Sequence, residues 1–232
     1  MRLDKMLAHL GYGSRKEVKK IIRAGWVLVN DELVRDDDFH VSEADSVVVY
    51  DENVEMLTEQ YFLMNKPAGT ICSHDNKLFP SVYDLFDEQL LPKTQAFGRL
   101  DQDTQGVLIL SSDGVLGHRL LSPKHHVKKV YQVDLLNSFD PKFISLIEKG
   151  IKIDKEEICA PATIEIVSDK RILLTLVEGK YHQVKRMMVA CENEVTNLIR
   201  IQFGPIMLDP KLEPGQYRKL SEEEIELLRN HA

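Results

Sequence analysis

The stretch that decides the fold reads GRLDQDTQGVLILSSDG and covers residues 98–114. It places an arginine and two carboxylates after a glycine and then continues as an apolar run over residues 107–110. A short apolar run bounded by turn residues is typical of a buried strand. At a period of two, Arg99, Asp101 and Asp103 share one side, so we expect at least one carboxylate to line a cleft. The alternative interpretation is that these charges decorate a turn before the strand.

Further strand-like runs surround this stretch, whereas helical patterns are fewer. The strand-like runs cover residues 61–64, 107–110, 130–135, 163–167, 172–177 and 198–203. The helical patterns cover residues 142–148, 183–191 and 221–228, the last opening with a capping box. Strands with occasional helices and no regular alternation predict an α+β fold, with a mixed, mainly antiparallel sheet and flanking helices.

The N-terminal 50 residues predict a separate small module of two helices and a sheet. Apolar residues recur at helical spacing over residues 3–10, and Ser14 opens a second helix with a capping box. A valine-rich strand over residues 27–29 turns at Asn30-Asp31, and residues 47–49 are expected to complete the sheet.

Charge is distributed unevenly along the chain, whose net charge is −7. Residues 1–30 carry seven basic and two acidic side chains, whereas residues 31–60 carry one basic and eleven acidic side chains. Such segregation predicts one surface that attracts a polyanion. Because residues 51–60 are acidic and lack periodicity, we expect a linker there, followed by a larger domain over residues 61–232.

Composition excludes several classes of protein. Of the 232 residues 43% are hydrophobic and 29% are charged, which is typical of a globular protein. No apolar run approaches the roughly 18 residues that a membrane span needs, and no secretory signal opens the chain, so we expect a cytoplasmic protein. Cys72, Cys159 and Cys191 lie far apart without a Cys-x-x-Cys pair, which predicts free thiols and no metal site.

The N-terminal run RLDKMLAHLGYGSRKEVKKIIRAGWVLVNDELV resembles the RNA-binding module of ribosomal protein S-four, over residues 1 to about 48. In that family the cationic second helix lies on folded RNA and contacts phosphates and shape more than base edges. The resemblance implies RNA contacts by Arg15, Lys19 and Arg23.

Three further clusters join residues 98–114: NKPAG at 65–69, KVYQV at 129–133 and EGKYHQVKRM at 178–187. Together they resemble the pseudouridine synthases, in the branch that carries the S-four-like module, over essentially the whole chain. Within that branch the sequence looks most like the synthases that act on small-subunit (16S) ribosomal RNA. The resemblance implies an isomerase that converts one uridine of that RNA to pseudouridine.

The resemblance also implies roles for individual residues. Asp101 matches the essential aspartate, and Lys185 occupies the position of the basic residue that pairs with it. Tyr131 matches a tyrosine that stacks on the uracil and is a candidate for removing the proton from carbon 5. Asp103 and Thr104 are expected to hydrogen-bond within the loop and to hold Asp101 in place.

Other residues are expected to bind the substrate. Arg99 is a candidate to hold the flipped nucleotide's phosphate, to fill the vacated place of the base, or to order the loop. Lys129 ends a basic run beside Tyr131 that is expected to follow the phosphate backbone. His182 and Gln183 are expected to contact RNA or to have a structural role. The remaining members of the basic run are Arg119, Lys124, His125, His126 and Lys128.

Two alternatives to a synthase remain: a non-catalytic RNA-binding assembly factor, and a glycosidase-like hydrolase that uses Asp101 and Asp103. For the synthase, sequence does not choose between attack of Asp101 on the anomeric carbon and elimination to a glycal. No cofactor and no metal are expected. The expected partner is ribosomal RNA, within an assembling small subunit, bound by a monomer that does not associate with membranes.

Overall fold

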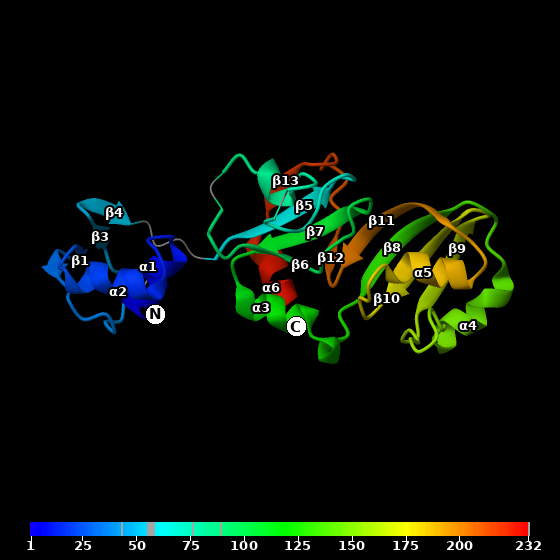
Figure 1. The fold of residues 1–232 in the computed structure, drawn as a ribbon, viewed down its shortest axis with the longest axis horizontal. Coiled ribbons are helices and arrows are strands. Elements are labelled where there is room, and N and C mark those ends of the chain that lie inside the picture. The colour runs from blue at the N-terminus through cyan, green and yellow to red at the C-terminus, as the bar shows by residue number, and fades with distance from the viewer. Residues whose placement is uncertain (43, 55–58, 76, 89, 232) are drawn as a thin grey trace. The chain divides into compact units, whose positions relative to one another are not determined.

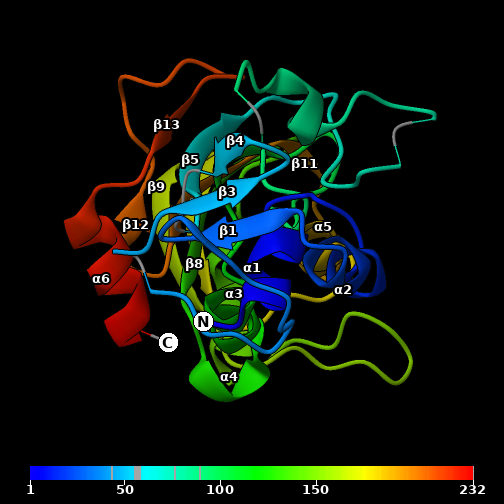
Figure 2. The same ribbon diagram turned by 90° about the vertical axis from the view of Figure 1, so that its left-hand side faces the viewer.

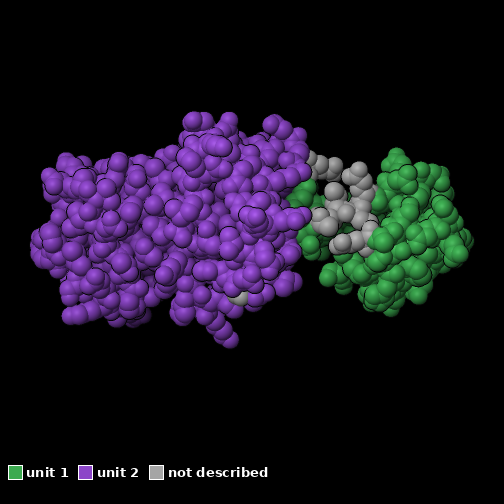
Figure 3. All heavy atoms as spheres, turned by 180° about the vertical axis from the view of Figure 1, so that it is seen from behind, with its two compact units in different colours: residues 1–60, 89–94 green, residues 61–88, 95–232 purple. Residues whose placement is uncertain are grey.

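The computed structural model describes residues 1–42, 44–54, 59–75, 77–88 and 90–231. The chain forms two compact units, one of residues 1–60 and 89–94 and the other of residues 61–88 and 95–232 (Figure 3). Each unit has its own hydrophobic core. Among the described helices, none is long and apolar enough to cross a membrane.

The N-terminal unit combines two helices with a four-stranded antiparallel sheet (Figure 2). Ser14 caps the second helix as its sequence predicts: its backbone N–H donates to Glu17 Oε2 over 2.7 Å, and its Oγ accepts from the Glu17 N–H over 3.4 Å. Buried leucine, isoleucine and valine side chains join the helices to the sheet. The elements are α1 (Leu3–His9), α2 (Arg15–Arg23), β1 (Val27–Val29), β2 (Glu32–Leu33), β3 (Val47–Val49) and β4 (Glu52–Val54), with the strand order β2-β1-β3-β4.

The segment expected to be a linker begins as part of this sheet. Tyr50 and Asp51 form a hairpin turn with φ angles of 52° and 66°, and β4 then pairs with β3. The prediction of a linker over residues 51–60 was therefore wrong for residues 51–54. An exposed edge strand has no buried face, so it lacks the apolar alternation by which strands are recognised. Residues 55–58 of the expected linker lie outside the described residues.

The second unit is built on a nine-stranded mixed sheet (Figure 1). Its strand order is β13-β5-β7-β11-β8-β10-β9, with β6 paired to β7 and β12 paired to β11. Among the strand pairs of the described residues, only β7 and β11 run parallel, so the prediction of a mainly antiparallel mixed sheet is confirmed. The strands are β5 (Tyr61–Lys66), β6 (Gln95–Phe97), β7 (Gln105–Ser111), β8 (Lys129–Leu135), β9 (Thr163–Ser168), β10 (Arg171–Leu176), β11 (Val195–Phe203), β12 (Ile206–Met207) and β13 (Tyr217–Lys219).

Two hydrophobic cores lie along this sheet. Helices α3 (Gly114–Leu121) and α6 (Glu222–His231) contribute to a core with β5 and β7, whereas α4 (Ile144–Lys149) and α5 (Gln183–Ala190) contribute to a core with β8 and β10. The boundary between the cores falls where β7 meets β11, since β11 supplies Leu198 to one core and Phe203 to the other. Short 3₁₀ helices η1 (Val82–Leu85), η2 (Pro123–His125) and η3 (Pro141–Phe143) complete the elements.

Helix α3 was not predicted from the sequence. Gly114 and Gly117 lower the helix propensity of this segment. A Cβ atom at Gly117 would overlap the ring of Phe97 in β6, so the glycine allows α3 to lie close to that strand. Asp113 compensates by accepting hydrogen bonds from the backbone N–H groups of Val115 and Leu116, over 3.1 and 3.0 Å.

Substitution of Gly106 tests the close pairing of β7 and β11. Gly106 has a φ of +103°, and a Cβ atom there would overlap the backbone oxygen of Arg200. Gly106→Ala is therefore expected to lower the free energy of unfolding by about 3 to 5 kcal/mol, measured by urea denaturation. Gly69→Ala is the control, because Gly69 has a φ of +90° but open space around it, and should cost only the backbone strain, about 1 to 2 kcal/mol. Equal losses in the two variants would contradict the overlap.

Candidate active site

A cleft of about 640 Å³ in the second unit contains most of the side chains predicted to act on a substrate. Its walls come from the loop over residues 98–104, from the ends of β8 and β10, from the loop that precedes α5, and from β11. The predicted site residues that line it are Arg99, Asp101, Lys129, Tyr131, His182 and Gln183. Its volume lies in the range of small-molecule sites.

The loop over residues 98–104 presents Asp101 to this cleft. Leu100 is buried, whereas Arg99 and Asp103 are exposed and Asp101 is half-buried. Asp101 lines the cleft, as expected of at least one carboxylate, but the backbone turns at Gln102 and Asp103 and is not a strand, so the alternation of a strand does not apply here: Leu100 also lines the cleft and Asp103 does not.

Lys66, at the end of β5, holds this loop in place through hydrogen bonds to backbone carbonyl groups. Its side chain is fully buried, and its ammonium donates hydrogen bonds to the carbonyl oxygens of Pro67, Gln102 and Thr104, over 3.0, 3.2 and 2.9 Å. Burial lowers the pKa of Lys66 to about 8 despite the nearby acidic groups. Sequence reasoning did not identify this residue. The available signal was a lysine at the end of a buried strand, where a charged group needs partners.

Lys185 extends from the first turn of α5 to both carboxylates of the loop. Its Nζ lies 3.5 Å from Asp101 Oδ2, and it donates hydrogen bonds to Asp103 Oδ1 and Oδ2 over 2.6 and 2.8 Å. The expected contact with Asp101 is present, but the hydrogen bonds go to Asp103. Burial raises the pKa of Asp103, but the hydrogen bond and charge of Lys185 outweigh it and bring the pKa below its usual value.

This geometry corrects the expectation that the side chains of Asp103 and Thr104 hydrogen-bond within the loop, whereas the backbone of Thr104 does so as expected. Asp103 bonds to Lys185. The hydroxyl of Thr104 is buried without a hydrogen-bond partner among the described residues. The backbone N–H of Thr104 donates to the backbone carbonyl oxygen of Asp101 over 3.1 Å.

His182 and Gln183 belong to the loop that closes the cleft before α5. His182 has a left-handed backbone with a φ of 46°, and its Nε2 lies 3.8 Å from Asp101 Oδ1. Its ring stacks on that of Tyr181 at a centroid distance of 3.9 Å. Gln183 is buried; its amide donates to Glu178 Oε1 over 2.7 Å and accepts from the Lys180 N–H over 2.8 Å. Gln183 therefore shapes the loop, whereas His182 faces the carboxylate.

Tyr131 and Lys129 project from β8 toward the cleft. Tyr131 is 9% exposed, and Lys129 is 8% exposed. Lys129 was predicted to follow a phosphate backbone as part of a basic run, but unlike the exposed Lys124 and Lys128 it is buried within the cleft wall. Strand alternation turns it inward, beside Tyr131 and away from its neighbours in the sequence. Arg99 lies on the cleft rim, with no ion pair to any residue that the structure describes.

The three residues of the N-terminal unit that were predicted to contact RNA differ in whether an ion pair already engages their charge. Lys19 Nζ lies 2.6 Å from Asp37 Oδ2, and Arg23 Nη2 lies 2.9 Å from Asp37 Oδ1. Arg15 is exposed, and no described residue forms an ion pair with it. Lys19 and Arg23 therefore stabilise the unit, whereas Arg15 presents a free charge.

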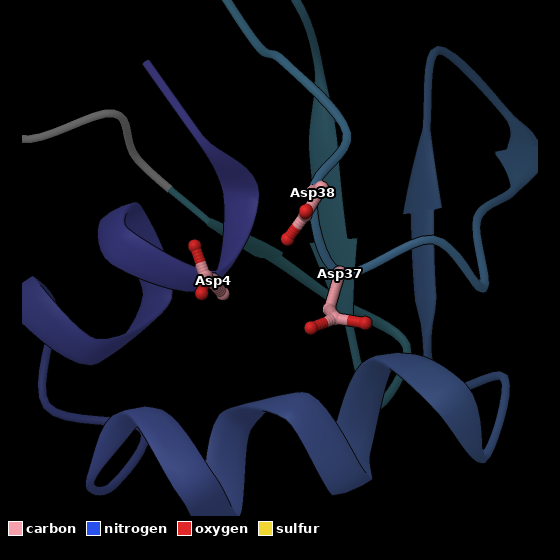
Figure 4. Close-up of side chains that lie close together, drawn as sticks. All are labelled: Asp4, Asp37 and Asp38. Atoms are coloured by element: carbon pink, nitrogen blue, oxygen red, sulfur yellow. The ribbon is translucent and has the colours of Figure 1, made fainter.

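Three carboxylates gather beside these cations, on Asp4, Asp37 and Asp38 (Figure 4). Each is paired with a cation: Asp4 and Asp38 contact Arg2, and Asp37 contacts Lys19 and Arg23. Hydrogen bonds from Lys19 and then Arg23 lower the pKa of Asp37 to about 2. We interpret the cluster as an ion-pair network within the unit.

Comparison with known proteins adds an independent finding. Residues 60–190 match the family model described as RNA pseudouridylate synthase, and residues 1–47 match that of the S4 domain. The chain is 44% identical to an uncharacterised RNA pseudouridine synthase of Bacillus subtilis, covering 98% of each. It is 41% identical to the ribosomal small subunit pseudouridine synthase A of Haemophilus influenzae, covering 98% of this chain and 99% of the relative. A crystal structure of a pseudouridylate synthase matches with a TM-score of 0.70 and 40% identity, covering 98% of this chain and 99% of the other.

Replacement of Lys66 by methionine tests its role under the loop. Lys66→Met leaves three carbonyl oxygens without this donor and should lower the free energy of unfolding by about 2 kcal/mol or more at pH 7. Between pH 8 and 10.5 Lys66 is protonated in the unfolded chain but largely not in the folded one, so raising the pH favours the folded wild type. The free energy of unfolding of the wild type should therefore exceed that of Lys66→Met by an amount that grows by up to about 1.4 kcal/mol per pH unit between pH 8 and 10.5. Urea denaturation at pH 7.5 and 9.5 measures it, and a difference that does not change with pH would contradict the burial of a charged lysine.

Proposed function

Because the chain belongs to the RNA pseudouridylate synthase family, we propose that it isomerises a specific uridine of small-subunit (16S) ribosomal RNA to pseudouridine, with Asp101 as the catalytic carboxylate. The RNA class follows from relatives that are named ribosomal small subunit pseudouridine synthase A and align over nearly their full length. The observation that carries the catalytic assignment is a half-buried carboxylate, Asp101, with the Lys185 ammonium 3.5 Å away, on the wall of a nucleoside-sized cleft.

The reaction exchanges one bond of the ribose for another. The bond from C1′ to N1 of uracil breaks, and a bond from C1′ to C5 forms, so the ribose must be stabilised while it is electron-poor. Asp101 supplies the negative charge, either by bonding to C1′ or by removing the 2′ proton to form a glycal. After C5 attacks C1′, a proton leaves C5 and a proton is added to N1, which completes an isomerisation without redox change or hydrolysis.

The neighbours of Asp101 divide the remaining tasks. The ammonium of Lys185, 3.5 Å from Asp101 Oδ2, pairs with the carboxylate and helps to hold it in the cleft. Tyr131 offers a ring on which the uracil stacks and a hydroxyl to accept the C5 proton. Arg99, on the rim, holds the phosphate of the flipped nucleotide, and His182 limits the space above Asp101.

The N-terminal unit docks on the RNA through the exposed cationic side of α2. Arg15, Lys16 and Lys20 are exposed, and no described residue forms an ion pair with them, so they are free to neutralise phosphates. Lys19 and Arg23 contribute charge from within their ion pairs. We assign this binding to a monomer in the cytoplasm, acting on RNA in an assembling small subunit.

Asp101→Asn tests the catalytic assignment. The variant keeps the size of the side chain but loses its charge, so pseudouridine formation should fall by at least about 10³-fold, with unchanged folding and RNA affinity. In cells that lack the gene, reverse-transcription mapping of the 16S RNA should show one lost pseudouridine, restored by the wild type and not by the variant.

Asp103→Asn is the matched control, two residues away on the same loop. Its ion pair with Lys185 is solvent-exposed and is worth about 1 kcal/mol or less, so turnover should remain within about tenfold of the wild type. Turnover by Asp101→Asn would exclude Asp101 as the catalytic carboxylate. If no pseudouridine disappears from 16S RNA in the deletion strain, the proposed substrate is wrong.

Arg15→Gln tests the docking surface. Arg15 is exposed, and no described residue forms an ion pair with it. Its removal should therefore make the negative slope of log affinity against log salt concentration shallower by about 1, without changing the free energy of unfolding of the protein. Lys19→Gln is the contrast, since it removes an ion-pair partner of Asp37 and should destabilise the N-terminal unit. RNA binding by the full chain, titrated over a range of salt concentrations, measures the slopes. An unchanged slope for Arg15→Gln would exclude this residue from the RNA interface.

A further inference from the structure

Two buried cations in the cleft wall have no carboxylate partner. Lys129 is 8% exposed and Arg200 is 1% exposed, and neither forms an ion pair within the part of the chain that the structure describes. Lys129 donates one hydrogen bond, to the carbonyl oxygen of Val127 over 2.9 Å. Arg200 donates from Nε to the Val107 oxygen and from Nη2 to the Gly98 oxygen, each over 2.8 Å. An ammonium has three donors and a guanidinium five, so both groups keep donors that these bonds do not use.

Strand register places both cations beside Tyr131. Arg200 in β11 lies directly opposite Tyr131 in β8, and directly opposed residues of an antiparallel pair project to the same face. Lys129 precedes Tyr131 by two residues along β8, so it shares that face as well. The cations therefore flank the aromatic ring on which, by the proposed function, the uracil stacks.

The acidic groups of the cleft are committed to other partners. Asp101 faces Lys185 and His182. Glu178 accepts hydrogen bonds from the Ala160 N–H and the Gln183 amide, over 2.8 and 2.7 Å, and lies 3.9 Å from Lys180 Nζ. Lys129 therefore has no ion-pair partner among the described residues: burial, followed by the charge of Arg200, lowers its pKa to about 8, and the charge of Glu178 offsets this only in part. Buried charges in proteins are normally paired, so this arrangement indicates a ligand that brings negative charge.

We propose that Lys129 and Arg200 form an anion subsite for the uracil ring, where they stabilise the negative charge that the base acquires when its glycosidic bond breaks. This inference rests on the proposed function and adds a leaving-group site to it. When the bond from C1′ to N1 breaks, its electron pair stays on the uracil and spreads over N1, O2 and O4. The unused donors of Lys129 and Arg200 hydrogen-bond to these atoms. When C5 then attacks C1′, the electron pair moves into the new bond, and both cations are left unchanged.

A backbone phosphate is the other anion that RNA offers, and burial argues against it. A phosphate is strongly hydrated and joins two riboses, whereas Arg200 is almost fully buried in the wall of the cleft. A flat, weakly hydrated base fits beside Tyr131, and charge that develops only during the reaction is stabilised most strongly by groups already fixed in a site with little water.

Lys129→Met tests the subsite because it keeps an unbranched side chain of nearly the same length and removes its charge. On 16S RNA fragments that contain the modified uridine, the single-turnover rate at saturating enzyme should fall by about 10²-fold or more, with RNA affinity within about twofold of the wild type. Lys129→Arg restores a cation and should be at least about tenfold faster than Lys129→Met. Lys170→Met is the control: Lys170 is exposed in the turn between β9 and β10, does not line the cleft, and its loss should leave the saturated rate unchanged.

A better leaving group distinguishes this role from a structural one. Fluorine at C5 stabilises the uracil anion, so on RNA that carries 5-fluorouridine the defect of Lys129→Met in cleaving the glycosidic bond should be at least about tenfold smaller. An equal defect on both RNAs would overturn the proposal. A defect confined to affinity would assign Lys129 to a phosphate and would overturn it as well.

Folding and the proposed function are checked separately. Lys129→Met removes an unpaired buried charge, so its thermal unfolding midpoint at pH 7 should equal or exceed that of the wild type. A clearly lower midpoint, without recovery of activity in Lys129→Arg, would make Lys129 structural and overturn the subsite. Absence of pseudouridine with the wild type would refute the proposed function itself, whereas an active wild type and an equally active Lys129→Met would refute only the subsite.

Discussion

The position of Asp101 depends on one buried ammonium group, that of Lys66. The loop over residues 98–104 has no regular structure, yet Lys66 holds its carbonyl oxygens at Gln102 and Thr104, directly after Asp101. Lys66 lies opposite Gly106 in the pairing of β5 with β7, at the point where the loop enters the sheet. The central strands and the loop that carries Asp101 are therefore joined by this ammonium group, whose hydrogen bonds hold the loop in a fixed conformation.

The cleft contains both acidic and basic side chains, and two of the basic side chains have no acidic partner among the described residues. Lys185 is shared between Asp101 and Asp103. Among the described residues, Lys129 and Arg200 donate hydrogen bonds only to backbone carbonyl oxygens, and both lie over the ring of Phe203. Breaking a glycosidic bond separates charge, because the ribose becomes electron-poor and the base electron-rich. In the proposed function the carboxylate acts on the sugar and the cations act on the base. Such a site matches the separated charges more closely than it matches the neutral substrate, which is what catalysis requires.

The N-terminal unit shows why the number of basic residues overstates an RNA-binding surface. Seven basic side chains precede residue 31, but Arg2, Lys19 and Arg23 are engaged by Asp4, Asp37 and Asp38. These aspartates come from the segments before and after the helix that they neutralise. The sequence shows the excess of positive charge, whereas which charges are free depends on how the chain folds back.

Sequence alone predicted the longer strands of the large sheet and several side chains of the cleft, because alternation and motifs are local properties, but it did not predict the short strands β6, β12 and β13. It did not predict α3, whose glycines are explained only by its packing on Phe97, nor the role of Lys66. Arg200 was included in a predicted strand, and an arginine between apolar residues of a strand is itself a signal, since it requires partners when it is buried. Those partners are carbonyl groups about a hundred residues earlier, and the residue beside it, Tyr131, comes from a third segment. Because these groups come from three distant segments, no local pattern in the sequence predicts that they meet. The proposed base subsite can therefore be recognised only from the folded sheet.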